Sequence, residues 1–340
     1  MTPARVLRVC AALAVLLVAA AAASASFGST SIDLGHALSS EPTIDRIILL
    51  HDRLPRTALA VIVGAALAVV GVAFQALVRN PLADPFVLGT SGGAALGATA
   101  SLVLGLGAIP VAGLVLPGTP LLAFAGAAGA LALVYGLASF RGRLLPVHLL
   151  LIGVVFNFFA SAVIMFLKTV VAAQKAQEML LWLMGSLSLE GLSLRDIALS
   201  GTLVAGGIAV IAASSGALNV ISLGDEGAAH LGVDLDRVRR RIFVATSLMV
   251  GAAVSVSGLI GFVGLVVPHA LRLVLGPDHR LLVPASALAG AALLVLCDLL
   301  ARLLFPVLTT EAPVGVLTAF IGGPVFVWLL VRTRAAPKDP

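Results

Sequence analysis

The chain has 340 residues, of which 60% are hydrophobic and 11% are charged, whereas soluble domains carry roughly 25% charged residues. Its mean hydropathy of +1.14 excludes a soluble globular protein, because water would have to hydrate more apolar surface than a folded monomer exposes. The sequence lacks the alternating pattern of a membrane barrel, and its 35 glycines favour closely packed helices. We therefore expect an all-α integral membrane protein.

Uncharged runs of about 20 residues predict about ten membrane spans, since a charge at the bilayer centre costs roughly 2.5 to 3.5 kcal/mol. The expected spans are residues 9–27, 57–78, two within 85–140, 144–167, 197–214, one full and one short span within 242–269, 281–304 and 312–331. Pro110 and a turn at 117–120 divide the first long stretch, and Gly258 and Gly261 divide the second. An interfacial segment is expected at 174–189. Residues 1–340 then form a single polytopic domain.

Basic residues predict the orientation of the chain, because Lys and Arg are enriched in cytoplasmic loops. If the first span begins inside, 14 of the 21 basic residues lie on the cytoplasmic side and seven lie outside. We therefore predict a multi-pass protein with both termini in the cytoplasm. The competing interpretation is that Arg5, Arg8 and the small residues at 23–25 belong to a cleavable signal peptide.

Few residues offer enzymatic chemistry. The sequence Gly-Thr-Ser-Gly at 89–92 matches the G-x-S-G pattern of intramembrane serine proteases, with Ser91 as nucleophile and His269 as base. Gly93 and Gly97 have the spacing of a close helix contact, which explains the segment more simply. None of the three Lys residues follows Gly, so we expect no P-loop, and ATP with its Mg²⁺ would be used by a partner. We expect no enzyme, no bound cofactor and no metal site in this chain.

Asp298 is an ionisable residue inside the expected ninth span, where it could relay protons in a secondary transporter. Arg302 lies one helical turn further along, so the two side chains can instead neutralise each other on one helix face. We favour this structural pairing, and we keep the proton-coupled secondary transporter as the alternative function.

The charged segment 222–241 lies on the predicted cytoplasmic side and carries helix-capping signals. Ser222 precedes Asp225 by three residues, as in a capping box, Gly232 can end a short helix in the left-handed conformation, and Asp234 can cap a second helix. Two short helices are therefore expected. The segment is either a solvated loop that anchors the next span through its arginines or a rigid docking element for a soluble partner.

A series of recognisable motifs extends along nearly the whole chain. They are Arg-Leu-Pro-Arg at 53–56, Val-Gly-Ala-Ala-Leu-Ala at 63–68, Gln75 with 79–85, Leu-Gly at 88–89, Trp-Leu-Met-Gly-Ser at 182–186, Gly-Asp-Glu at 224–226, Leu-Gly-Val at 231–233, 261–269, Gly-Pro-Asp-His-Arg at 276–280 and 311–315. Together these motifs resemble the FecCD family of permeases, the membrane subunits of ABC importers for ferric siderophores, haem and cobalamin. Ala312 departs from the family, which more often has Leu there.

The resemblance implies the type II ABC importer permease fold, with about ten transmembrane helices per subunit. It implies a homodimer with ABC ATPase subunits on the cytoplasmic side and a periplasmic substrate-binding protein outside. The expected function is transport of a metal chelate across the inner membrane by ATP-driven alternating access. A ferric siderophore is the first candidate substrate, with haem and cobalamin as alternatives.

The resemblance also assigns roles to residues. The segment 222–241 becomes the loop that couples to the ATPase, with contacts expected from Gly224, Asp225, Glu226, His230, Leu231 and Gly232. The translocation pathway, formed by the fifth and tenth spans, is expected to include Asn157, Ser161, Thr318 and Ile321. The external charges Arg53, Arg56 and Arg302 are expected to dock acidic patches of the binding protein, with Arg53 and Arg56 as a bare positive pair.

Overall fold

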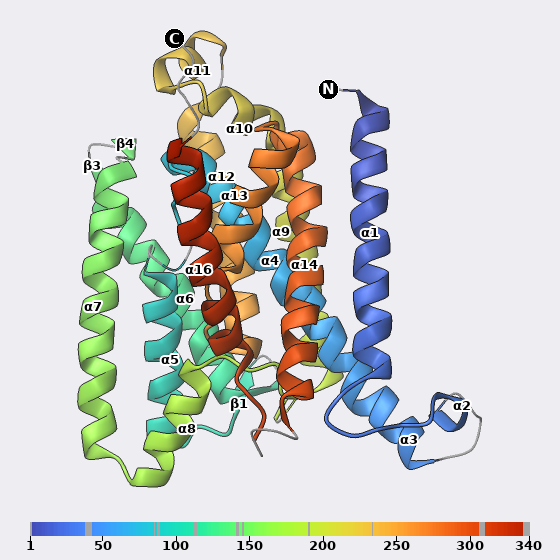
Figure 1. Cartoon of the computed structure of the whole chain (residues 1–340). Coiled ribbons are helices and arrows are strands. Elements are labelled where there is room, and N and C mark those ends of the chain that lie inside the picture. Colours follow the sequence, from blue (N-terminus) through green and yellow to red (C-terminus); the bar gives the residue numbers. More distant parts are fainter. Residues whose placement is uncertain are drawn as a thin grey trace.

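The computed structural model describes residues 2–37, 43–84, 86, 89–111, 114–140, 143–144, 146–189, 191–232, 234–305 and 310–335. These residues form a bundle of long helices that run roughly along one axis, with two short hairpins (Figure 1). The expected all-α membrane class is confirmed, since the structure is mostly helical and several helices are long and apolar.

The helices in chain order are α1 (Pro3–Ser26), α2 (Leu34–Ala37), α3 (Ile44–Ile47), the π-helix η1 (Ile48–Arg53), α4 (Leu54–Val78), α5 (Thr90–Leu104), α6 (Gly118–Ala138), α7 (Pro146–Val170), α8 (Ala173–Leu183), α9 (Leu194–Ala213), α10 (Ser215–Ile221), α11 (Asp225–His230), α12 (Leu235–Ser257), α13 (Val263–Leu275), α14 (His279–Leu303) and α16 (Val314–Ala335). Strands β1 (Ala108–Val111) and β2 (Leu114–Pro117) form one antiparallel hairpin, and β3 (Ser139–Phe140) and β4 (Arg143–Leu144) form the other.

Every span expected from the sequence coincides with a helix. Within the described residues, seven helices are long and apolar enough to cross a membrane: Pro3–Ser26, Ile44–Val78, Gly118–Ala138, Val147–Val170, Leu194–Ala213, Leu235–Ser257 and His279–Leu303. Thr90–Leu104, Val263–Leu275 and Val314–Leu329 are apolar but shorter. The count of ten crossings therefore stays a prediction.

Helix ends differ from the expected span ends where charged residues continue a helix. Helix α4 begins at Leu54 and so includes Arg56, and α12 begins at Leu235, seven residues before the expected apolar run at 242. An uncharged run measures the part of a helix that can lie in hydrocarbon, whereas the helix itself extends until its backbone is capped.

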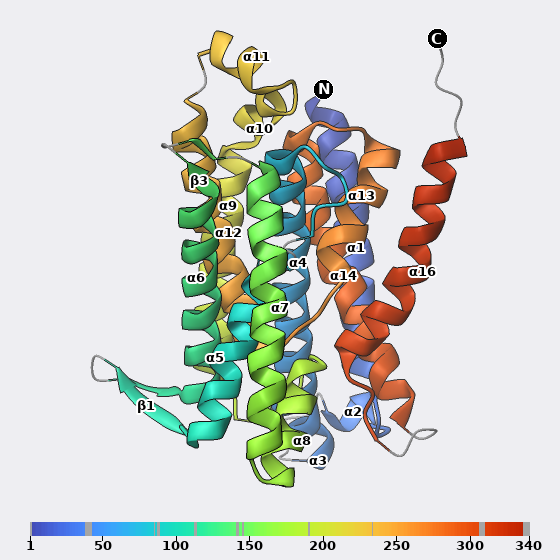
Figure 2. The same ribbon diagram turned by 90° about the vertical axis from the view of Figure 1, so that its left-hand side faces the viewer.

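Helix α4 is the centre of the bundle. Its most apolar stretch is 83% buried, whereas the corresponding stretch of α1 is only 6% buried. Helices α9, α12, α13 and α14 pack around α4, and α1 lies outside against α14 (Figures 1 and 2). The core side chains of α4, among them Leu59, Val63 and Phe74, are fully buried.

Glycines allow the backbones of neighbouring helices to touch. A Cβ atom on Gly71 of α4 would lie 1.8 Å from the carbonyl oxygen of Gly264 in α13. A Cβ atom on Gly93 of α5 would lie 2.3 Å from the carbonyl oxygen of Gly126 in α6, and one on Gly97 would lie 1.9 Å from that of Leu122. The close contact expected from the spacing of Gly93 and Gly97 is confirmed.

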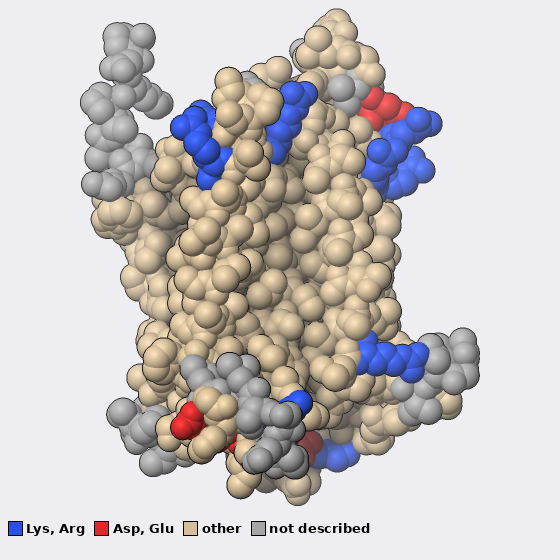
Figure 3. Space-filling model, turned by 90° about the vertical axis from the view of Figure 1, so that its right-hand side faces the viewer, with Lys and Arg blue, Asp and Glu red and all other residues tan. Residues whose placement is uncertain are grey.

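The two ends of the bundle differ in content. The beginning of α1, the α10–α11 segment and the last turn of α16 all lie at one end, the upper end in Figures 1 and 2, and the β1–β2 hairpin and α8 lie at the other. Basic side chains gather toward both ends, and a broad uncharged band lies between them (Figure 3). The first turn of α1, the last turn of α16 and the α10–α11 segment thus share one end of the bundle. The prediction that all three lie in the cytoplasm requires this arrangement.

Replacing Gly71 by Ala should destabilise the bundle by about 1 to 3 kcal/mol, because the added methyl group meets backbone that cannot move aside. Gly129→Ala in α6 is the matched control, since a Cβ atom there meets nothing within 4 Å. Thermal unfolding of the two purified variants in detergent measures the difference. Equal melting temperatures would contradict the proposed close contact between α4 and α13.

Candidate functional site

A buried ionic cluster lies at the end of the bundle opposite α11. It consists of Arg56 from α4, Asp298 and Arg302 from α14, and Glu311, which precedes α16. Arg56 contacts Asp298 through Nε and Oδ1 at 2.9 Å, and Glu311 through Nη1 and Oε2 at 2.9 Å. Arg302 Nε lies 3.1 Å from Asp298 Oδ2. Asp298 therefore forms ion pairs with two arginines, and Arg56 forms ion pairs with two carboxylates.

Arg302 and Arg53 bind the carboxyl end of α1. Arg302 Nη1 donates to the carbonyl oxygens of Ser24 and Phe27 at 3.2 and 3.3 Å. Arg53 Nη1 donates to the carbonyl oxygens of Ala25 and Ser26 at 2.9 and 2.7 Å. The last carbonyls of a helix lack partners within the helix and carry its negative dipole end, so guanidinium groups satisfy them well. The two arginines thus attach the peripheral α1 to α4 and α14.

These contacts correct the expectation for the three arginines. Arg53 and Arg302 are each 1% exposed and Arg56 is 5% exposed, so none is an unpaired surface charge available to an acidic partner. The sequence analysis treated each arginine as the end of a span, but their long side chains turn inward to polar groups of other helices. The favoured pairing of Asp298 with Arg302 is confirmed, whereas the sequence analysis missed the link from Arg56 to Asp298 and Glu311.

The segment 222–232 forms a turn and a short helix at the upper end of the bundle (Figure 1). Gly224 and Gly232, which flank α11, have φ of 117° and 75°, so the left-handed conformation predicted at Gly232 is confirmed. Asp234 accepts a hydrogen bond from the backbone N–H of Arg237 at 3.0 Å, so it caps a helix as expected. That helix is α12, which continues to Ser257, so the expected second short helix is instead the beginning of a long one.

Ser222 does not cap α11. Its hydroxyl donates to the carbonyl oxygen of Leu218 at 2.9 Å, so it closes α10 instead. Ala228 is buried, whereas His230 and Leu231 are exposed, Leu231 to 65%. Asp225 and Glu226 form the first turn of α11, and the arrangement of their side chains lies outside the described part of the chain.

A polar clamp, which the sequence analysis did not find, ties α10 to the start of α14. Asn219 Oδ1 accepts from the backbone N–H of His279 at 2.8 Å, and Asn219 Nδ2 donates to Asp278 Oδ1 at 2.8 Å. The hydrogen bond from Asn219 lowers the pKa of the Asp278 carboxyl below its usual value. These hydrogen bonds therefore join α10 directly to the start of α14. In the sequence, the motif at 276–280 contains Asp278 and His279 but gives no indication that they contact Asn219.

The four expected pathway residues do not form one polar strip. Asn157 Nδ2 donates to the carbonyl oxygen of Phe86 at 2.8 Å, and its Oδ1 accepts from the backbone N–H of Gly92 at 3.1 Å, so this amide holds the loop before α5. Thr318 is buried and donates to the carbonyl oxygen of Gly315. Ser161 on α7 and Ile321 on α16 are exposed.

Helices α7 and α16 carry a large apolar exposed surface. Aromatic side chains on α7 and α16 are each more than half exposed, and they are Phe158, Phe159, Phe166, Phe320 and Trp328. Helix α16 stands away from α7 in Figure 2. This surface suits contact with hydrocarbon or with another apolar protein face.

The protease interpretation has no geometric support. Ser91 Oγ donates to the carbonyl oxygen of Phe86 at 3.0 Å, and His269 stacks edge-on against Phe326 with ring centroids 6.2 Å apart. Among the described residues, no hydrogen bond joins Ser91 to His269. The same part of the chain contains no cluster of three or more His, Cys, Asp or Glu that could hold a metal ion.

Long apolar helices, a rigid loop at one end and an apolar open face define a multi-pass membrane protein without an assembled catalytic site in its described residues. Residues 13–332 match the model of the FecCD transport family, so the chain belongs to that family.

Relatives cover most of the chain. The hemin transport system permease protein HmuU of Yersinia pestis is 41% identical over 95% of this chain and 95% of its own length. The cobalamin import system permease protein BtuC of Halobacterium salinarum is 43% identical over 85% of this chain and 74% of its own length. A solved structure, described as an inward-facing conformation of a protein assigned to the metal-chelate type of ABC transporter, has a TM-score of 0.81 and 30% identity over 96% of this chain and 99% of its own.

Replacing Asp298 by Asn should lower the free energy of unfolding by about 3 kcal/mol, because two buried guanidinium groups lose their shared counter-charge. Asp52→Asn is the control, since Asp52 is exposed at the same end of α4 and should matter by less than about 0.5 kcal/mol. Thermal unfolding in detergent measures both variants. A proton relay at Asp298 would instead show lost transport at unchanged stability.

Proposed function

We propose that this chain is the permease subunit of a binding-protein-dependent ABC importer that moves a metal chelate across the inner membrane. The observation that carries the proposal is the match to a hemin permease over 95% of both chains, which extends through the α10–α11 segment and both ends of the bundle. The chain supplies the membrane path, and ATP and Mg²⁺ are used by separate ATPase subunits.

The segment from α10 to α11 is the proposed contact with the ATPase. Residues 224–232 lie at one end of the bundle, with both glycines that flank α11 at positive φ, which supports a fixed shape. The Asn219 clamp connects this segment to α14, and α14 packs along α4 at the centre. A push on α11 by the closing ATPase would therefore reach the core helices, as alternating access requires.

A second copy of the chain is the proposed partner of the α7 and α16 face. Two such faces opposite each other would enclose a path of apolar and small polar side chains, with Ser161 and Ile321 among the accessible ones. A wide path that binds its cargo weakly lets a large chelate leave again. This argument supports a homodimer with the path along its axis.

The binding protein is proposed to dock at the end that carries the β1–β2 hairpin and α8. Because Arg53, Arg56 and Arg302 are buried, their contribution there is to fix α1, α4 and α14 beneath the docking surface. Glu311 is the accessible member of the ionic cluster, with 38% of its side chain exposed. Cytoplasmic termini follow from this orientation, with α11 inside.

The proton-coupled alternative has no comparable support. Asp298 makes ion pairs with both Arg56 and Arg302 and is fully buried, so a proton entering this site would break two pairs. The family members named above are permease proteins of import systems, and their names mention no proton coupling.

Reconstitution with its ATPase and binding protein tests the function. We expect uptake into proteoliposomes that requires ATP and the loaded binding protein, measured with a ferric siderophore, haemin and cobalamin in parallel. The ferric siderophore remains the first expectation from the sequence. Uptake without the ATPase, driven by a proton gradient, would overturn the proposal.

Gly232→Val should abolish ATP-driven uptake, because φ of 75° strains a β-branched residue and distorts the link between α11 and α12. Glu226→Arg should act similarly by reversing a charge in the first turn of α11. Gly227→Ala is the control, since this glycine lies inside α11 without positive φ and without a neighbour within 4 Å of its Cβ position. Normal uptake by the first two variants would place the coupling contact elsewhere, at 79–84 or 276–280.

Orientation is tested by cysteine labelling. A cysteine at Leu231 should react with an impermeant reagent only in inverted vesicles, and a cysteine at Ile44 only in intact cells, because both positions are well exposed at opposite ends. The background needs replacement of Cys10 and Cys297, which are free thiols. Labelling of the Leu231 position from outside would reverse the predicted topology.

A further inference from the structure

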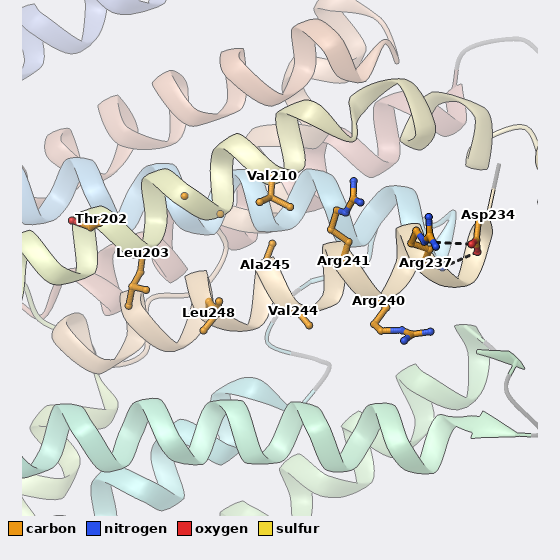
Figure 4. Close-up of a pocket in the computed structure, with 12 residues that line it drawn as sticks. Thr202, Leu203, Val210, Asp234, Arg237, Arg240, Arg241, Val244, Ala245 and Leu248 are labelled. Carbon is orange, nitrogen blue, oxygen red and sulfur yellow. Dashed lines mark hydrogen bonds and ion pairs between the residues drawn. The ribbon is translucent and has the colours of Figure 1, made fainter. Parts of the chain in front are cut away.

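An open groove runs between α9 and α12 on the outside of the bundle (Figure 4). It encloses about 690 Å³. Its walls include Leu203, Gly206 and Val210 from α9 and Val244 and Leu248 from α12. None of its lining residues comes from α7 or α16, and both walls are helices that are long and apolar enough to cross a membrane.

Three arginines stand at one end of this groove. Arg237, Arg240 and Arg241 are exposed, and Asp234 is the one acidic group that lines the groove, paired with Arg237 at 3.6 Å. The mouth therefore keeps an excess of two positive charges.

The apolar part of the groove fits within one membrane leaflet. Leu248 lies seven positions beyond Arg241 along α12, which at 1.5 Å per residue is about 10 Å, less than the roughly 15 Å of one hydrocarbon leaflet. Gly206 leaves this part open, since a Cβ atom there would meet nothing within 4 Å. A phosphate at the arginines would thus be followed by an apolar channel that takes the first part of an acyl chain.

We propose that this groove binds one anionic phospholipid, with its phosphate among the arginines at the mouth and one acyl chain along Gly206. A lipid held here would bridge α9 to the first turns of α12, which directly follow the α11 segment. The inference is independent of the transported substrate. The competing explanation is that the arginines contact an acidic surface of a protein partner and that the apolar walls face ordinary lipid.

Native mass spectrometry of the purified, delipidated full chain tests the site, with phosphatidylglycerol and phosphatidylcholine as probes. We expect one tightly retained phosphatidylglycerol and no comparable phosphatidylcholine. The double variant Arg240→Gln, Arg241→Gln should weaken phosphatidylglycerol binding roughly 25-fold, because each of the two basic groups near an anionic lipid contributes about a fivefold factor. Gly206→Leu should weaken it without any change of charge, because the new side chain fills the channel.

Two controls decide between the explanations. Arg5→Gln, Arg8→Gln removes the same charge at the same end of the bundle, and Gly129→Leu adds the same side chain at an equally open position on α6. Both should retain the lipid. Equal loss in the arginine control, or full retention in Gly206→Leu, would overturn the proposal. The Arg240→Gln, Arg241→Gln variant could also lose its binding to the ATPase subunit while it still binds phosphatidylglycerol. That result would assign these arginines to a protein interface and would also overturn the proposal.

Discussion

The pairing of Asp298 with two arginines is the interaction on which the lower end of the structure depends. Arg56 and Arg302 approach the same carboxylate from α4 and α14, and Arg302 also binds the last carbonyls of α1. Helix α1 buries little of its apolar surface, so hydrophobic packing alone holds it weakly. In lipid, apolar contact between helices gives little driving force, and satisfied polar groups together with close packing determine which helices associate.

At the opposite end, hydrogen bonds of one amide side chain tie two helices together. Asn219 joins α10 to the loop and first residue of α14, and glycines at positive φ set both ends of α11. Since α14 extends from this clamp to Asp298, one helix connects the proposed ATPase contact to the ionic cluster at the far end. Between them, glycine contacts such as Gly64 with Gly290 bring α4 and α14 into backbone contact. Helix α14 is therefore joined to its neighbours at both ends and along its length.

The sequence alone determined the class, the helical segments and several local features. Apolar runs located the helices because hydrocarbon excludes charge, and the spacing of Gly93 and Gly97 revealed a close contact because small residues at that interval share a helix face. The pairing of Asp298 with Arg302 and the capping by Gly232 and Asp234 were also predictable, since they involve residues within a turn of each other.

Only the tertiary structure decided how distant polar groups meet. The sequence could not show that Arg56 reaches Asp298, 242 positions away, that Arg53 turns inward to the end of α1, or that Asn219 meets His279. It also could not show that the Asn157 amide donates a hydrogen bond to the loop before α5. Local patterns fix local geometry, whereas these contacts follow from which helix faces pack together, and that depends on the shape of the whole bundle.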